Sequence, residues 1–149
     1  MTDRLDARTL RHLERLVALE ADVIRAVAGD AIVHADARTD NMILTADGAA
    51  LVDWPAACLG APWIDLVACL PALHLDGGPP PGETLSWATA DGQFGDVDDR
   101  IDPFLAALAG YFIGQALLPD PPGLPTVRGF QAAQGRVTTT WILDRLRLD

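Results

Sequence analysis

The 149-residue chain is half apolar and 21% charged, a composition that supports a packed core and excludes intrinsic disorder. Its formal net charge is −10, which argues against a nucleic-acid or anionic-membrane partner. All of its Lys and Arg residues are Arg. The length predicts a single domain, residues 1–149. The lack of a signal-like N-terminus and the wide spacing of Cys58 and Cys69 predict a cytoplasmic protein with reduced thiols in its core.

The chain begins with one predicted helix. Apolar residues repeat at steps of three and four from about residue 8 to residue 28, which predicts a long amphipathic helix ending at Gly29. Residues 31–33 then predict a short strand.

A β-hairpin is predicted next. Two apolar triplets, 42–44 and 50–52, flank an Asp-Gly pair at 47–48, and this pair between apolar runs is a strong hairpin signal. Neither triplet alternates with polar residues, so both faces of the hairpin are expected to be covered. With the turn centred near the Asp, Asn41 and Asp53 come within about one residue of lying opposite each other.

The remainder of the chain predicts helices separated by breaks. Pro62 suits the first turn of a helix that reaches roughly Leu73 and is kinked or ended before Pro71. Residues 76–82 form a break, and the acidic region 83–99 that follows has room for one short helix. An apolar helix is then predicted over 101–118, buried rather than membrane-spanning. The last predicted helix, 126–147, is amphipathic, with Thr126 as its cap.

Oxygen-bearing side chains gather around the hairpin. Asp36 lies on the loop that enters its first strand, and Asn41 and Asp53 flank its open end. Burying a carboxylate is costly unless a cation or hydrogen-bond donors compensate it. A carboxylate and an amide oxygen suit Mg²⁺ that is shared with substrate phosphates, and a second carboxylate can accept a proton from an attacking hydroxyl. These residues therefore predict a site at the open end of the hairpin.

The motif His-x-Asp-x-x-x-x-Asn at 34–41, followed by Val-Asp-Trp at 52–54, resembles the catalytic loop and metal-binding strand end of protein-kinase-like phosphotransferases. "GAPWIDL" at 60–66 and the stretch at 107–135 make the likeness more specific, to the aminoglycoside phosphotransferase family, which shares its fold with choline and homoserine kinases. The resemblance covers only the C-terminal lobe of that fold. It implies a mainly helical (α+β) lobe with one small hairpin around residues 42–53.

The resemblance also implies roles for individual residues. Asp36 would be the base that orients and deprotonates the acceptor hydroxyl, and Asn41 and Asp53 would hold the Mg²⁺ that bridges the phosphates of ATP. Arg38 matches a position that faces phosphate in protein kinases, although a surface or carboxylate-paired Arg is the commoner arrangement. The acceptor would be a small molecule with a hydroxyl group.

Four further residues near the site have structural interpretations. His34 is expected to pack and hydrogen-bond within the loop without a chemical role. Asp65 would brace the catalytic loop, or would simply complement a helix dipole. Asp40 is expected to cap or face water, and Asp47 to serve only the turn. A cationic acceptor is favoured by an acidic cluster that could also be only a solvated loop: Asp91, Asp96, Asp98, Asp99 and Asp102.

A phosphotransferase of this kind also needs a second lobe with a Lys that contacts the phosphates. Only about thirty residues precede the catalytic loop, and the chain contains no Lys. The chain is therefore expected to be inactive alone. Three explanations stay open: a fragment of an enzyme, an enzyme whose other lobe is a separate chain, or a non-catalytic binding module built on this lobe.

Two other kinds of site fit the sequence poorly. "DARTD" at 36–40 faintly resembles the start of an aspartyl-nucleophile phosphatase or dehalogenase, but that fold needs repeated strand–helix units downstream. A Ca²⁺ loop in "DGQFGDVDDRID" at 91–102 fails because its Gly and terminal Glu are misplaced.

Overall fold

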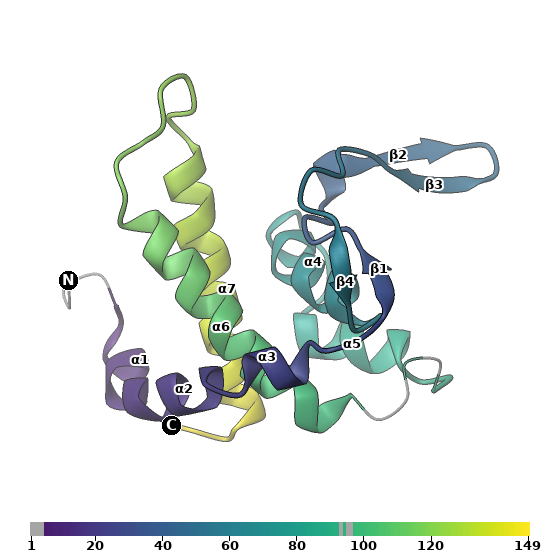
Figure 1. Cartoon of the computed structure of the whole chain (residues 1–149). Helices are drawn as coiled ribbons and strands as arrows, with labels where there is room; N and C mark the ends of the chain where they lie inside the picture. The colour runs from purple at the N-terminus through teal and green to yellow at the C-terminus, as the bar shows by residue number, and fades with distance from the viewer. Residues whose placement is uncertain (1–4, 93, 95–96) are drawn as a thin grey trace. The chain divides into compact units, whose positions relative to one another are not determined.

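The computed structural model of the chain describes residues 5–92, 94 and 97–149 (Figure 1). Contacts divide the chain into two compact units: a helical unit, Met1–Ala26 with Asp98–Asp149, and a hairpin unit, Val27–Val97. Most regular structure in the described residues is helical, with two small two-stranded sheets. The predicted mainly helical α+β fold is confirmed, while the single-domain organisation stays a prediction.

The N-terminal segment of the helical unit is broken, so the prediction of one helix over residues 8–28 is wrong. Its three helices are α1 Ala7–Arg11, α2 Leu13–Glu20 and α3 Val23–Ala26. The first break is at His12, whose backbone angles of φ −109° and ψ 9° leave the helical region and whose Nε2 lies 2.9 Å from the carbonyl of Asp149. Apolar periodicity selects the buried face of a segment, but it does not require an unbroken hydrogen-bond ladder.

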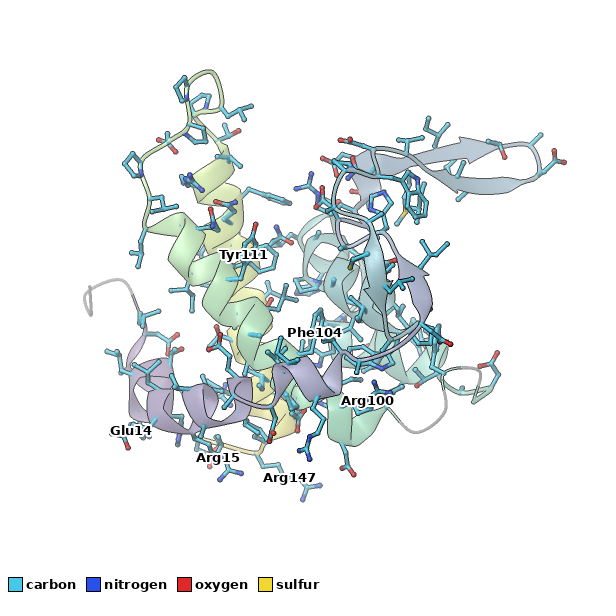
Figure 2. All side chains as sticks on the ribbon, viewed as in Figure 1. Glu14, Arg15, Arg100, Phe104, Tyr111 and Arg147 are labelled. Atoms are coloured by element: carbon cyan, nitrogen blue, oxygen red, sulfur yellow. The ribbon has the colours of Figure 1, made fainter. Side chains whose placement is uncertain are left out.

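Two long helices complete the helical unit, α6 Asp98–Ala116 and α7 Val127–Arg145, and they confirm the last two predicted helices. They pack closely at Gly135, where an added Cβ would lie 3.3 Å from the side chain of Ile113. Thr126 occupies the cap position of α7, but its side chain makes no capping hydrogen bond. Figure 2 shows charged side chains such as Glu14 and Arg147 directed outward from this unit.

The hairpin unit contains two antiparallel sheets. One pairs β1 Ala31–Val33 with β4 Cys58–Gly60, a strand that the sequence did not predict. Cys58 is exposed on β4, so the prediction that both thiols lie in the core is wrong for this residue. At Gly29 a Cβ would collide with the backbone of Gly60 and Ala61, so a glycine is needed where the chain enters β1.

The second sheet is the predicted hairpin, formed by β2 Met42–Thr45 and β3 Gly48–Leu51. Thr45 pairs with Gly48, so the loop is Ala46–Asp47, one residue earlier than the predicted Asp-Gly pair. The expectation that both faces are covered is wrong, because Leu44 is 85% exposed and every residue of β2 is exposed. Continuous apolar sequence identified a strand pair, but it did not determine whether that pair is buried.

Two helices follow the sheets, α4 Ile64–Leu75 and α5 Pro81–Ala88, with Pro81 in the first turn of α5. Helix α4 confirms the helix predicted from Pro62 and continues through Pro71 instead of ending before it. Val67 and Leu70 on α4, and Trp63 directly before it, are buried in the core. Within the described part of the chain, no helix is long and apolar enough to cross a membrane.

Candidate active site

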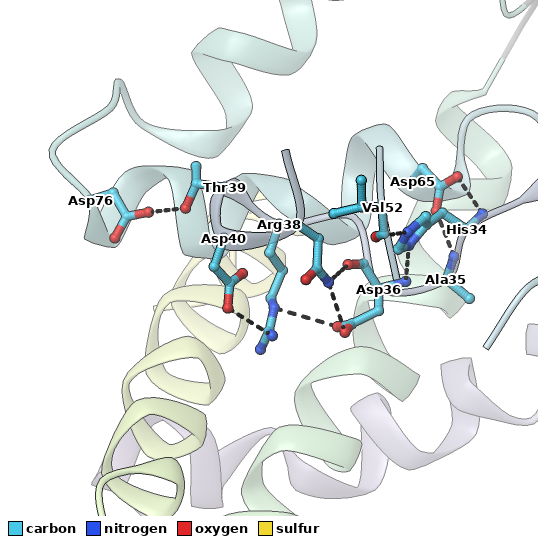
Figure 3. Close-up of polar contacts among 10 residues, drawn as sticks. His34, Ala35, Asp36, Arg38, Thr39, Asp40, Val52, Asp65 and Asp76 are labelled. Carbon is cyan, nitrogen blue, oxygen red and sulfur yellow. Dashed lines mark hydrogen bonds and ion pairs between the residues drawn. The ribbon is translucent and has the colours of Figure 1, made fainter. Parts of the chain in front are cut away.

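The loop that follows β1 is held at its start by Asp65, the second residue of α4. One carboxylate oxygen accepts the backbone N–H of His34 at 2.7 Å, and the other accepts that of Ala35 at 2.8 Å (Figure 3). Ala35 has φ +62°, a left-handed conformation that is strained for any residue with a Cβ. Asp65 therefore braces the loop directly, as predicted, and it stabilises a conformation that alanine would otherwise avoid.

His34 links this loop to the end of the hairpin. Its ring is fully buried, and Nδ1 lies 3.3 Å from the backbone N–H of Asp36, which can only donate. Nδ1 is therefore the acceptor, and Nε2 carries the hydrogen that is donated to the carbonyl of Val52 at 2.9 Å. The ring also contacts Trp54 edge to face at 4.6 Å between centroids. Both ring nitrogens are thus engaged in structure, in agreement with the packing role expected for His34.

Asn41 and Asp36 are brought together by hydrogen bonds. The Nδ2 group of Asn41 donates to the backbone carbonyl of Asp36 at 2.8 Å and to its carboxylate Oδ2 at 3.1 Å (Figure 3). Because both amide hydrogens are used in this way, the carbonyl oxygen Oδ1 of Asn41 is left as the group that can bind a cation. The residue is buried, at 7% exposure, so packing as well as hydrogen bonds fixes the orientation of its amide.

Arg38 lies between two carboxylates. Its Nε is 3.4 Å from Oδ1 of Asp36, and its Nη2 is 3.0 Å from Oδ2 of Asp40. This is the carboxylate-paired arrangement that the sequence left open beside a phosphate-facing one. Asp40 neither caps a helix with its side chain nor merely faces water, since it shares the guanidinium with Asp36. The pairing places a positive charge beside the candidate base.

Asp53 stands at the end of β3, on the other side of the hairpin opening. The N–H of Val52 donates to the carbonyl of Asn41 at 2.9 Å, so Asp53 is one residue beyond the partner of Asn41, as the predicted register required. Asp53 has φ +64° and is exposed. Its carboxylate makes no hydrogen bond or ion pair with any described residue. A left-handed non-glycine residue beside a catalytic-type loop is a common mark of a functional site.

The available ligands suit Mg²⁺. Asn41 offers an oriented amide oxygen and Asp53 an unpaired carboxylate, both hard oxygen donors. Among the described residues, no group of three or more His, Cys, Asp and Glu side chains could form a cage around a metal ion. Mg²⁺ is commonly bound by one or two carboxylates together with substrate phosphates, so a small donor set of this kind fits it.

The structure describes only some side chains of the acidic cluster. Asp102 is paired with Arg145 at 2.7 Å within the helical unit, which neutralises much of its charge. Asp91 and Asp99 are exposed. Asp96 and the side chain of Asp98 lie outside the described residues. The electrostatic preference for a cationic acceptor thus stays a prediction.

Two features of the site were not predicted from the sequence. One is the left-handed backbone conformation of Ala35, and the other is the hydrogen bond from Thr39 to Asp76. Alanine carries no sequence signal for a left-handed conformation, because glycine and asparagine are the usual residues there. Thr39 and Asp76 are 37 positions apart, so no local pattern relates them.

The sequence model of the phosphotransferase enzyme family, APH, matches residues 1–104 of the chain. The chain belongs to this family. The match includes the loop from His34 to Asn41, the hairpin and α4, and it confirms the resemblance that the motifs indicated. No curated protein and no solved structure matches the chain significantly. Membership in the phosphotransferase enzyme family supports kinase-type chemistry in general, and the roles of single residues stay predictions.

Proposed function

We propose that the chain carries the catalytic-loop side of a phosphotransferase that moves the γ-phosphate of ATP to a hydroxyl group of a small molecule. The observation that carries this proposal is the arrangement of Asp36, whose carboxylate is oriented by Asn41 and paired with Arg38 at the open end of the hairpin. Family membership supports the reaction class.

In this proposal Asp36 is the general base. Asn41 donates a hydrogen bond to Oδ2 of Asp36, and Arg38 pairs with Oδ1. These contacts orient the carboxylate, and each of its oxygens still has a free lone pair. A hydroxyl that donates to one of these lone pairs is oriented for attack, and its proton passes to Asp36 as the bond to phosphorus forms. Arg38 adjusts the charge beside the base and offers a positive group to the transferred phosphate.

Asn41 and Asp53 would hold Mg²⁺ together with the phosphates of ATP. When bound, the ion supplies positive charge that neutralises the phosphate oxygens. The chain's own contribution is to keep both oxygen ligands in place: hydrogen bonds to Asp36 fix Asn41, and pairing at Val52 fixes the strand end that presents Asp53. The acceptor is a small hydroxyl compound, and the net charge of −10 favours a cationic one.

An acceptor screen tests the proposal. Transfer of radiolabelled γ-phosphate is measured with amino sugars, choline-like alcohols, neutral sugars and hydroxy acids. The chain is used alone and fused to the nucleotide-binding lobe of another family member. Asp36→Ala and Asp53→Ala should each lower the rate of the active form about a hundredfold or more. Asp47→Ala is the matched control, because Asp47 is an exposed Asp at the hairpin tip.

Two results would contradict the proposal. If Asp36→Ala loses no more activity than Asp47→Ala, the assignment of the base is wrong. If the fused form binds ATP with Mg²⁺ but transfers phosphate to no acceptor, the alternative of a non-catalytic binding module is correct. The unfused chain is expected to turn over very little, because it contains no Lys to anchor the phosphates.

A further inference from the structure

Helix α4 contacts the catalytic loop with two carboxylates, one near each end of the helix. Asp65 binds the backbone of His34 and Ala35, and Asp76, which follows the last residue of α4, accepts the hydroxyl of Thr39 at 2.6 Å. Figure 3 shows these contacts on opposite sides of Asp36. The two residues are eleven positions apart, which is close to three helical turns, so they lie on the same face of α4.

The dimensions of the loop match the spacing of its two contacts. Eleven residues of helix rise about 16 Å, and the five peptide steps from His34 to Thr39 span at most about 17 Å when extended. The side chains of Thr39, Asp65 and Asp76 add to this reach, so the loop contacts both carboxylates although its chain bends at the left-handed Ala35. Arg38, with φ −139° and ψ 165°, is extended.

The position of Asp76 is unfavourable for a carboxylate unless the group has a partner. The C-terminal end of a helix carries partial negative charge, which repels an anion. The side chain is not needed to cap α4, because the backbone N–H of Asp76 already caps the helix by donating to the carbonyl of Ala72 at 3.0 Å. The contact with Thr39 is short, as expected for a hydroxyl bound to a charged oxygen.

The contact reaches the site through a short rigid turn. Thr39 is the first residue and Asn41 the last residue of the 3-10 turn η2, Thr39–Asn41. Two backbone hydrogen bonds close the turn. The N–H of Asn41 donates to the carbonyl of Arg38, and the N–H of Met42 donates to the carbonyl of Thr39. A displacement of Thr39 therefore displaces the amide of Asn41.

We propose that Asp76 is a positioning residue that acts through Thr39 to hold the turn η2, and with it the amide of Asn41, against Asp36. The importance of this role for catalysis rests on the proposed function, but the positioning itself is a property of the loop and can be measured without activity. Removal of the Thr39–Asp76 contact should free the Asn41 amide while the fold is kept.

The test uses the fact that Asn41 is the only asparagine in the chain. Labelling with ¹⁵N-asparagine gives one pair of side-chain NH₂ signals at a single ¹⁵N shift, and their hydrogen-exchange rate reports whether the amide is bonded to Asp36. Thr39→Val and Asp76→Ala should each raise this rate about tenfold, the effect of losing one charge-assisted hydrogen bond at the surface. Thr39→Ser keeps the hydroxyl and should restore the slow rate.

The matched control is Thr45→Val, because Thr45 also donates an exposed hydroxyl bond, to the carbonyl of Gly48 in the hairpin. The rate should stay unchanged in this control. The double variant Thr39→Val/Asp76→Ala should exchange no faster than either single variant if the two residues act as a pair. An unchanged rate in folded Thr39→Val, or additive effects in the double variant, would overturn the proposal. An inactive site with a responsive Asn41 would refute only the proposed function.

Discussion

Replacing Asp65 with Ala is the sharpest perturbation of the loop that carries the candidate base. The variant removes the acceptors of two backbone N–H groups, those of His34 at 2.7 Å and Ala35 at 2.8 Å. Both bonds are charge-assisted and short. The left-handed Ala35 loses the contact that stabilises its conformation. We expect the loop to open while α4 and the hairpin persist.

The magnitude follows from these two bonds. A hydrogen bond to a charged group contributes about 1.5–3 kcal/mol, and the lower value applies because Asp65 is only half-buried. Two such bonds give about 3 kcal/mol, which is about a hundredfold in the equilibrium for loop opening. Replacing Ala35 with Gly in the same background should recover about 1 kcal/mol, since glycine adopts positive φ without strain.

The assay is hydrogen exchange of the His34 and Ala35 amides, followed by NMR, with urea unfolding as a check on the whole chain. Glu83→Ala is the matched control, because Glu83 is an acidic residue in the first turn of α5, as Asp65 is in α4, but it is exposed and makes no loop contact in the described residues. This control should cost only the helix-dipole contribution, about 0.3–1 kcal/mol. If Asp65→Ala costs no more than Glu83→Ala, Asp65 serves the helix dipole and does not brace the loop.

Three further predictions concern the rest of the chain. Cys58 should be alkylated about tenfold faster than Cys69, because burial raises the pKa of the Cys69 thiol; equal rates by mass spectrometry would contradict this. Hydrogen bonds from Thr9 lower the pKa of Asp6, so the cap stabilises α1 above the unfolded pKa of Asp and is lost as the pH falls through the lower folded value. Asp6→Ala should therefore cost about 1 kcal/mol in urea unfolding at pH 7, and progressively less as the pH falls below the unfolded pKa of Asp. Leu44→Thr should reduce self-association in sedimentation experiments, because Leu44 is 85% exposed on an apolar hairpin; unchanged sedimentation would refute this.

Local sequence signals were sufficient for the elements and for the outline of the site. Apolar triplets around an Asp-Gly pair predicted β2 and β3, and the pairing of Met42 with Leu51 brings Asp53 within one residue of facing Asn41. Proline and apolar periodicity likewise located α4, α6 and α7. These features depend on turn chemistry and on residues that are close together along the chain, so a single sequence contains the required information.

Tertiary structure alone decided which surfaces are buried and which distant side chains meet. The apolar pattern of the hairpin is the same whether or not something covers it, and only the structure shows that Leu44 is exposed. Asp65 and Asp76 are 31 and 37 positions from their partners His34 and Thr39, and each is an ordinary acidic residue when viewed locally. Their pairing with the loop arises because α4 packs beside it, and packing between distant segments leaves no periodic trace in either one.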